Sequence, residues 1–127
     1  MRALVIDDSR AMRRIVGAAL ESFGYETRQA GHGQEALDVL QEGYAPDLCT
    51  IDWNMPVMDG LQFVSVVRAN PAWRAVTLMM VTSESEQGQI VRALAAGAHE
   101  YVIKPFTADA LRDKLALLGL LPEEVSA

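Results

Sequence analysis

The fold is decided by the stretch from Asp47 to Gly60, whose sequence is Asp-Leu-Cys-Thr-Ile-Asp-Trp-Asn-Met-Pro-Val-Met-Asp-Gly. Residues 48–51 do not alternate polar with apolar side chains, which is typical of a strand buried on both faces of a sheet. Pro56 cannot donate a hydrogen bond to a sheet ladder, so we expect this strand to end near Asn54. Asp52 therefore lies at the end of a buried strand, where a carboxylate needs a hydrogen bond, an ion pair or a cation.

Strands and helices alternate on both sides of this stretch. Further strands are predicted at 3–6, 25–30, 77–81 and 100–103. Helices are predicted between Ser9 and Gly24, over 33–41, from Gly60 to Asn70, over 86–96 and from Thr107 to Gly119. Helical spacing predicts that Ile15 belongs to the buried stripe of the first helix and that Ile90, Val91 and Leu94 are the inward residues of the fourth.

This alternation predicts an α/β fold with a parallel sheet and helices on both faces. We expect the three most apolar strands to be central and the two more polar strands to be edges. No linker, repeat or low-complexity tract interrupts the sequence, so residues 1–127 are expected to form a single stand-alone domain.

Composition excludes several classes of protein. The chain of 127 residues is 50% hydrophobic and 22% charged, which argues against disorder. Its net charge of −6 argues against nucleic-acid binding. No apolar run is long enough to span a bilayer, and two acids follow residue 6 too early for a signal peptide. A single cysteine, Cys49, excludes an internal disulfide and favours a cytoplasmic location.

Polar side chains follow four of the predicted strands at the point where each strand ends. They are Asp7 with Asp8, Asp52, Thr82 and Lys104. Because parallel strands end at the same edge of a sheet, we expect these groups to gather there. Clustered carboxylates resist common ionisation, and a few carboxylates with room for water suit Mg²⁺. With a lysine and a hydroxyl added, the site is suited to a phosphoryl group.

These motifs resemble those of response-regulator receiver domains. The resemblance rests on Asp7-Asp8, Asp52 before Trp-Asn-Met-Pro, Met-Asp-Gly at 58–60, Thr82, and Tyr-Val-Ile-Lys-Pro-Phe at 101–106. It covers nearly the whole chain and is particularly close to the single-domain receivers of chemotaxis. The family has a flavodoxin-like fold, which implies five strands in the order 2-1-3-4-5 and five flanking helices.

The resemblance also assigns roles to the site residues. It implies that Asp52 accepts a phosphoryl group from a phosphohistidine. It implies that Mg²⁺ is held by Asp7, Asp8, Asp52 and the backbone carbonyl of Asn54. Lys104, whose peptide bond to Pro105 is expected to be cis, would contact the phosphoryl oxygens. Thr82 would hydrogen-bond the phosphoryl group, and Tyr101 would swing inward behind it as the switch.

Two further groups of residues concern the lifetime of the phosphoryl group and its readout. Asn54 and Glu84 are expected to modulate dephosphorylation, because each lies two residues after a site residue and reaches an attacking water. Ser83, between Thr82 and Glu84, departs from the alanine that the family tends to have there, but serine is still small enough for phosphate access and so concerns rate rather than function. The partner-binding face implied by the family comprises Ile90, Tyr101, Phe106 and Lys114.

The favoured function is therefore a single-domain response regulator that a histidine kinase or histidine phosphotransfer protein phosphorylates. We expect a monomer that catalyses only its own phosphorylation and dephosphorylation and whose target is a flagellar motor switch. The alternative within the class is a phosphorelay intermediate that passes the phosphoryl group to a histidine phosphotransfer protein.

The sequence disfavours three other functions. A Mg²⁺-dependent aspartyl phosphatase needs a second acid two residues after the nucleophile, where this chain has Asn54. A flavin mononucleotide carrier needs a phosphate-cradling loop after the first strand, where Asp7 and Asp8 would repel the phosphate. A receiver that signals without phosphorylation would not need the full set of acids, threonine and lysine.

Overall fold

Five parallel strands form one sheet in the order β2-β1-β3-β4-β5 in a computed structural model that describes residues 1–83 and 88–122. The strands are β1 (Arg2–Ile6), β2 (Glu26–Ala30), β3 (Leu48–Asp52), β4 (Thr77–Ser83) and β5 (Glu100–Lys104). The helices are α1 (Arg10–Ser22), α2 (Gly33–Gln41), α3 (Gly60–Ala69), the short 3₁₀ helix η1 (Pro71–Trp73), α4 (Ile90–Ala96) and α5 (Ala108–Leu117). The predicted fold class and strand order are confirmed.

The order of the strands follows from their polarity. Every residue of β3 is buried, and β1 and β4 are apolar along most of their length, so these three strands are central. The more polar strands β2 and β5 are the edges. In register, Ile51 of β3 lies between Ile6 of β1 and Met80 of β4. The ends of β1 and β3 are therefore level, which brings the residues that follow them together.

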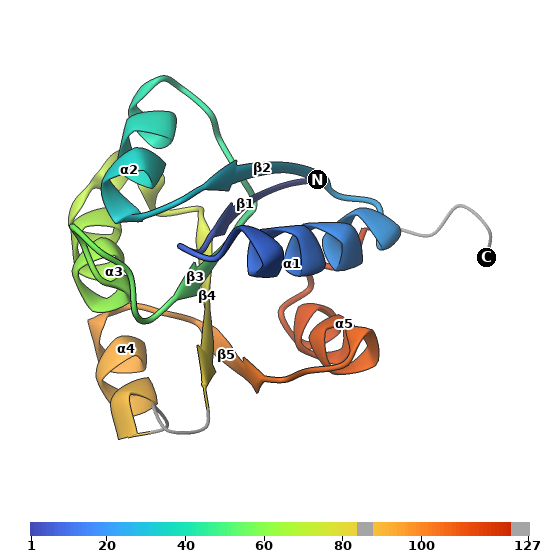
Figure 1. The fold of residues 1–127 in the computed structure, drawn as a ribbon. Helices are drawn as coiled ribbons and strands as arrows, with labels where there is room; N and C mark the ends of the chain where they lie inside the picture. Colours follow the sequence, from blue (N-terminus) through green and yellow to red (C-terminus); the bar gives the residue numbers. More distant parts are fainter. Residues whose placement is uncertain (84–87, 123–127) are drawn as a thin grey trace.

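Two hydrophobic layers cover the sheet. Alternate residues of a strand point to opposite faces, so β1 sends Leu4 and Ile6 into one layer and Ala3 and Val5 into the other. The first layer packs under α2, α3 and α4, and the second packs under α1 and α5 (Figure 1). Both groups of helices thereby have an apolar face to bury, and neither face of the central strands is left to water.

Local caps place the helix starts where the sequence predicts them. Ser9 and Thr107 cap α1 and α5 by accepting backbone N–H bonds at 3.2 and 3.0 Å. At α3, Asp59 and Gln62 form a reciprocal capping box. Such caps satisfy N–H groups that the first turn leaves without an intrahelical partner. They also fix the direction in which each chain segment leaves the carboxyl edge of the sheet.

Two expectations about buried helix faces are wrong. Ile15 of α1 is 55% exposed, although it follows the apolar period of its helix. In α4, Val91 and Leu94 are 73% and 39% exposed, and the buried residues are Ile90 and Ala93. The described part of α4 has only seven residues, so its contact with the sheet is a narrow stripe at spacing three rather than the wider face predicted.

Strand β4 is longer than predicted, since it continues through Thr82 and Ser83. These two residues pair with Ile103 and Lys104 of β5, beyond the point where β3 ends. Thr82 is consequently held in a regular ladder rather than in a loop, which fixes its side chain at the edge of the sheet.

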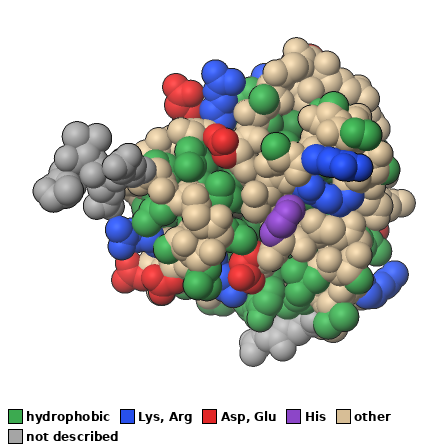
Figure 2. All heavy atoms as spheres, turned by 180° about the vertical axis from the view of Figure 1, so that it is seen from behind, with side chains coloured by type: hydrophobic (Ala, Val, Ile, Leu, Met, Phe, Trp, Pro, Cys, Tyr) green, Lys and Arg blue, Asp and Glu red, His purple; other side chains and the backbone are tan. Residues whose placement is uncertain are grey.

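Acidic and basic side chains are interspersed on the face of the molecule that Figure 2 presents, rather than gathered into one stripe. Among residues 1–83 and 88–122, no helix combines the length and hydrophobicity needed to cross a bilayer.

Arg68 braces the edge of the sheet opposite the carboxyl ends of the strands. Its guanidinium donates to the backbone carbonyls of Arg74, at 3.0 Å, and of Val76. With both ends of the side chain held, its aliphatic stem lies where a β-carbon on Gly97 would be, only 2.1 Å from Cγ. Gly97 also has φ = +125°, a conformation that side chains rarely adopt.

Replacing Gly97 with alanine should therefore lower the free energy of unfolding by about 2–4 kcal/mol, because backbone strain and displacement of Arg68 add together. Gly43→Ala is the matched control. Gly43 has φ = +102°, but nothing lies within 4 Å of its β-carbon position, so only the strain of about 1–2 kcal/mol is expected. Urea denaturation measures both, and equal losses would show that Arg68 does not fill the space.

His99 accepts a hydrogen bond at the same edge, from the Leu78 backbone N–H to Nδ1 at 3.1 Å. Partial burial and the nearby positive charge of Arg68 lower the pKa of His99. A depressed histidine pKa means that the unfolded chain takes up the proton first as the pH falls, so stability declines below the ordinary pKa of about 6.5.

We therefore expect the wild-type chain to lose more stability than His99→Asn between pH 7.5 and pH 5.5. Asparagine keeps an acceptor for the Leu78 N–H but does not titrate. Because the imidazole is largely exposed, the extra loss should be at most about 1 kcal/mol. Urea denaturation of both proteins at the two pH values measures it, and parallel losses would contradict the assignment.

Candidate functional site

Three carboxylates meet where β1 and β3 end. Asp7 and Asp8 follow β1 directly, and Asp52 is the last residue of β3. One carboxylate oxygen from each lies within 4.8 Å of the others. Asp7 and Asp52 are 3% and 6% exposed, whereas Asp8 faces solvent. The sequence-based expectation that these three acids converge is confirmed.

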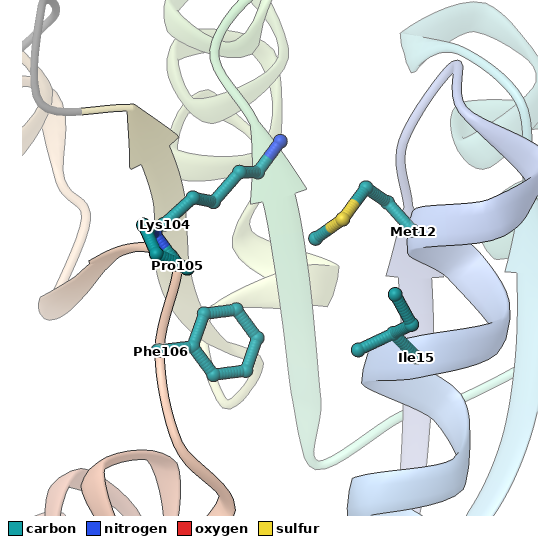
Figure 3. A pocket seen from close by; sticks show the side chains of 5 residues that line it. All are labelled: Met12, Ile15, Lys104, Pro105 and Phe106. Carbon is teal, nitrogen blue, oxygen red and sulfur yellow. The ribbon is translucent and has the colours of Figure 1, made fainter.

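Lys104 is the cation of the site, and it comes from the end of β5. Its Nζ lies 3.2 Å from Asp52 Oδ1 and 3.3 Å from Asp7 Oδ2. In Figure 3 the lysine side chain is extended, with its ammonium directed away from Pro105 and Phe106. The Lys104–Pro105 peptide bond is cis, as expected. One ammonium group is thus shared between two buried carboxylates.

The charges in this cluster do not balance. Burial raises the pKa of Asp52 to about 6, and the neighbouring Asp7 carboxylate adds to the rise, against the lowering effect of Lys104. Burial alone lowers the pKa of Lys104, but the Asp52 and Asp7 carboxylates together outweigh it, so this pKa is raised. The lysine therefore stays charged, while Asp52 retains an unmet need for positive charge.

Thr82 supplies a hydroxyl at the carboxyl edge of the sheet, on the strand next to β3. Val81 is the residue of β4 that pairs with Asp52, so Thr82 is the next residue along the adjacent strand. Its side chain is fully buried, and Oγ1 has no hydrogen-bond partner among the described residues. A buried hydroxyl without a partner costs about 1–3 kcal/mol. Such a group is suited to a polar ligand that arrives at the site.

Backbone contacts hold the carboxylates in place. Asp7 Oδ1 accepts the Ser9 N–H at 2.8 Å, and its own carbonyl accepts from Arg13 Nη1 at 2.7 Å. On the other strand, Gly60 donates its N–H to the Trp53 carbonyl at 3.0 Å. A β-carbon on Gly60 would lie 2.7 Å from the Asp52 carbonyl oxygen, so only glycine permits this approach of α3 to the end of β3.

The other predicted site residues fall into separate places. Asn54 is exposed in the loop after β3, and Glu84 lies outside the described residues. Tyr101 is half-buried on β5, with Lys114 Nζ 4.4 Å from the centre of its ring. Ile90 is 8% exposed and belongs to the core, whereas Phe106 packs on the α1 and α5 side of the sheet. Tyr101 and Lys114 of the predicted partner face contact each other, and the face as a whole stays a prediction.

A pocket of about 420 Å³ opens beside Lys104, and the sequence patterns do not predict it. Its lining residues, shown in Figure 3, are Met12, Ile15, Lys104, Pro105 and Phe106. Helical periodicity assigned Ile15 to the buried stripe of α1, but Ile15 and its neighbour Met12 face the segment after β5 across this pocket (Figure 3). The one sequence feature that could have indicated this pocket is the apolar pair Pro105-Phe106 directly after Lys104.

The donor set fits a metal ion. Three carboxylates within bonding reach of one point, two of them buried, repel one another unless a cation neutralises them. Oxygen donors of this kind are typical of hard divalent cations. The unmet need for charge at Asp52 is the observation that makes such an ion favourable, and the three aspartates are the residues that would hold it.

In the metal-free protein, Asp52→Asn should raise the free energy of unfolding by about 1–3 kcal/mol at pH 7.5, because it removes a buried negative charge beside Asp7. Lys104 keeps Asp7 as its partner in the variant. Urea denaturation in the presence of a chelator measures the effect. The control is Asp113→Asn, which removes an exposed carboxylate of α5 and should change stability by less than about 0.5 kcal/mol. A destabilised Asp52→Asn protein would contradict this account.

Comparisons with known proteins agree with this geometry. The family model for the response regulator receiver domain matches residues 3–116. The chain is 40% identical over 119 residues to chemotaxis protein CheY1 of Helicobacter pylori, covering 93% of this chain and 96% of that protein. It is also 40% identical over 116 residues to a CheY homolog of Campylobacter jejuni, covering 91% of this chain and 89% of that protein.

Solved structures show the same architecture. CheY4 of Vibrio cholerae superposes with a TM-score of 0.83 at 34% identity, over 91% of this chain and 96% of that one. The receiver domain of NtrX from Brucella abortus gives a TM-score of 0.83 at 28% identity, over 95% of this chain and 99% of that one. The chain therefore belongs to the family of response regulator receiver domains.

Proposed function

We propose that this receiver domain is a phosphorylation-controlled switch in which Asp52 accepts a phosphoryl group from the phosphohistidine of a histidine kinase or phosphotransfer protein. One observation carries the proposal. Asp52 is buried, paired with Lys104 and grouped with two further acids, and the adjacent strand carries the buried Thr82 hydroxyl, which has no partner among the described residues. This set of groups supports the proposed roles of nucleophile, cation site and phosphoryl contact.

The cofactor is proposed to be Mg²⁺, held by the carboxylates of Asp7, Asp8 and Asp52 and by the backbone carbonyl of Asn54. When bound, it supplies positive charge for the phosphoryl oxygens and favours the ionised form of Asp52. The choice of Mg²⁺ rests on the small number of protein carboxylates, because Mg²⁺ keeps several waters and phosphate oxygens in its coordination shell.

The residues of this chain then have defined tasks in the transfer. A carboxylate oxygen of Asp52 bonds to phosphorus as the bond between phosphorus and the donor imidazole nitrogen breaks. The electron pair of the broken bond stays on that nitrogen, and because the other ring nitrogen of the phosphohistidine carries a proton, the donor leaves as a neutral histidine and Asp52 becomes an acyl phosphate. Lys104 turns from Asp52 to a phosphoryl oxygen and offsets its charge. The Thr82 hydroxyl donates a hydrogen bond to another phosphoryl oxygen and so gains the partner that it lacks among the described residues. Positioning and charge do most of the work in such transfers.

The pocket beside Lys104 supports direct docking of the donor. A phosphohistidine must approach within bonding distance of Asp52, so the donor protein has to rest on the rim of the site. Ile15 is exposed on that rim, and the pocket wall is apolar apart from Lys104. Exposed apolar surface around a small pocket is typical of a protein-docking site.

The relatives named as chemotaxis proteins support a motor switch as the target of the phosphorylated form. The exposed Val91 and Leu94 of α4, together with Tyr101 and Lys114, offer a surface for that target. The alternative is a phosphorelay intermediate. The two are distinguished by whether phosphorylation raises affinity for a target or whether the phosphoryl group returns to a histidine on an added phosphotransfer protein.

Adding Mg²⁺ and then acetyl phosphate should change the tryptophan fluorescence in two steps. Trp53 follows Asp52 and is 8% exposed, so it reports events at the site. The Trp73→Phe background removes the other tryptophan, which lies in η1. In Asp52→Asn the second step should disappear, because the acceptor carboxylate is gone.

Intact mass spectrometry should show the gain of one phosphoryl group on the wild-type chain and none on Asp52→Asn. A wild-type protein that gains no phosphoryl group would overturn the proposed function. It would indicate a receiver that signals without phosphorylation.

A further inference from the structure

Tyr101 is held from two directions by one ion pair. Lys114 of α5 places its Nζ 4.4 Å from the centre of the Tyr101 ring and 3.1 Å from Glu100 Oε1. The same Glu100 oxygen accepts the Tyr101 backbone N–H at 3.0 Å. The side chains of Lys114 and Glu100 are only 28% and 20% exposed. A cation is thus fixed over the ring by the residue that precedes the tyrosine.

The arrangement is tighter than an ordinary surface contact. A free lysine loses rotamer freedom when it settles on a ring, which offsets much of the attraction. Here Glu100 already restricts the ammonium, so stacking on Tyr101 requires little further ordering. Partial burial of all three groups also weakens the screening of both interactions by water.

The strand register places Tyr101 and Thr82 on the same face of the sheet. Tyr101 pairs with Met80 on the neighbouring strand, and Thr82 is two residues beyond Met80. Side chains two apart on a strand share a face. Tyr101 also packs at the edge of the hydrophobic layer to which Met80 belongs. A ring that leaves Lys114 and moves along this face approaches the buried hydroxyl of Thr82.

From these contacts we infer that Lys114, fixed by Glu100, is a positioning residue that holds the Tyr101 ring beside its ammonium at the β5 edge of the sheet and opposes its movement towards Thr82. The inference rests on the proposed function, because that movement matters when Thr82 turns to a phosphoryl group. Phosphorylation of Asp52 then has to overcome the Lys114–Tyr101 contact. By linkage, weakening the contact strengthens binding at the phosphoryl site by the same factor.

The test is a titration of the chain with beryllium fluoride, a phosphoryl mimic, in saturating Mg²⁺ and followed by Trp53 fluorescence. Lys114→Gln should lower the midpoint by about twofold to tenfold, the range expected for losing one cation–ring contact. Lys114→Arg keeps a cation over the ring and should behave as the wild type. Glu100→Gln leaves the lysine less restricted and should fall between the two.

Two controls separate the ring contact from other effects. Arg92→Gln removes one positive charge from α4, where the guanidinium contacts Gln89 at 3.1 Å, and should leave the midpoint unchanged. In a Tyr101→Ala background, Lys114→Gln should have no further effect, because the double-mutant cycle removes the partner. The carbon-13 ring signal of Tyr101, assigned by its loss in Tyr101→Phe, should shift in Lys114→Gln before any ligand is added.

The outcomes separate this inference from the proposed function. A wild-type chain that responds, with Lys114→Gln and Arg92→Gln giving equal midpoints, overturns the role of Lys114 and leaves the phosphorylation site intact. The same is true if Lys114→Gln acts equally in the Tyr101→Ala background. A wild-type chain that does not bind the phosphoryl mimic overturns the proposed function and this inference together.

Discussion

Three carboxylates gather with one ammonium group, which contacts two of them, at the carboxyl edge of the sheet, and the rest of the site depends on that imbalance. Asp7 and Asp52 are buried among apolar strands, so their mutual repulsion is poorly screened. Lys104 contacts both of them but neutralises only one charge. The protein holds this arrangement with backbone bonds to Asp7 and with the close approach of Gly60 to Asp52. This imbalance of charge is what makes a cation favourable there.

Much of this site is a product of topology. Parallel strands deliver their last residues to one edge, so acids after β1, an acid ending β3, a hydroxyl on β4 and a lysine ending β5 meet without any long-range design. That is why fold and site were both predictable from sequence. Apolar runs locate the strands, and the polar residue after each run is automatically part of the cluster. The edge strands were equally predictable, because β2 and β5 are the more polar ones.

The failures of prediction have a common physical cause. Periodicity shows which helix face is apolar but not whether a neighbour lies against each residue on it. Ile15 has the spacing of a buried residue in its helix, yet it borders a pocket. Val91 and Leu94 of the short α4 are exposed because they lie outside the narrow stripe of α4 that contacts the sheet. The bracing of Arg68, the acceptor role of His99 and the Glu100–Lys114 pair join residues far apart in the sequence or in unremarkable contexts. No local pattern announces contacts of that kind.

Lys104 belongs to two places at once, since it pairs with Asp52 and also forms part of the pocket wall. A protein resting on that wall is therefore in contact with the group that turns when the phosphoryl group arrives. In the proposed transfer Lys104 turns to a phosphoryl oxygen, so the surface that the donor contacts before the reaction differs from the surface that it contacts afterwards. In that proposal, the lysine that assists the reaction also changes the surface on which the donor rests, which links phosphoryl transfer to release of the donor.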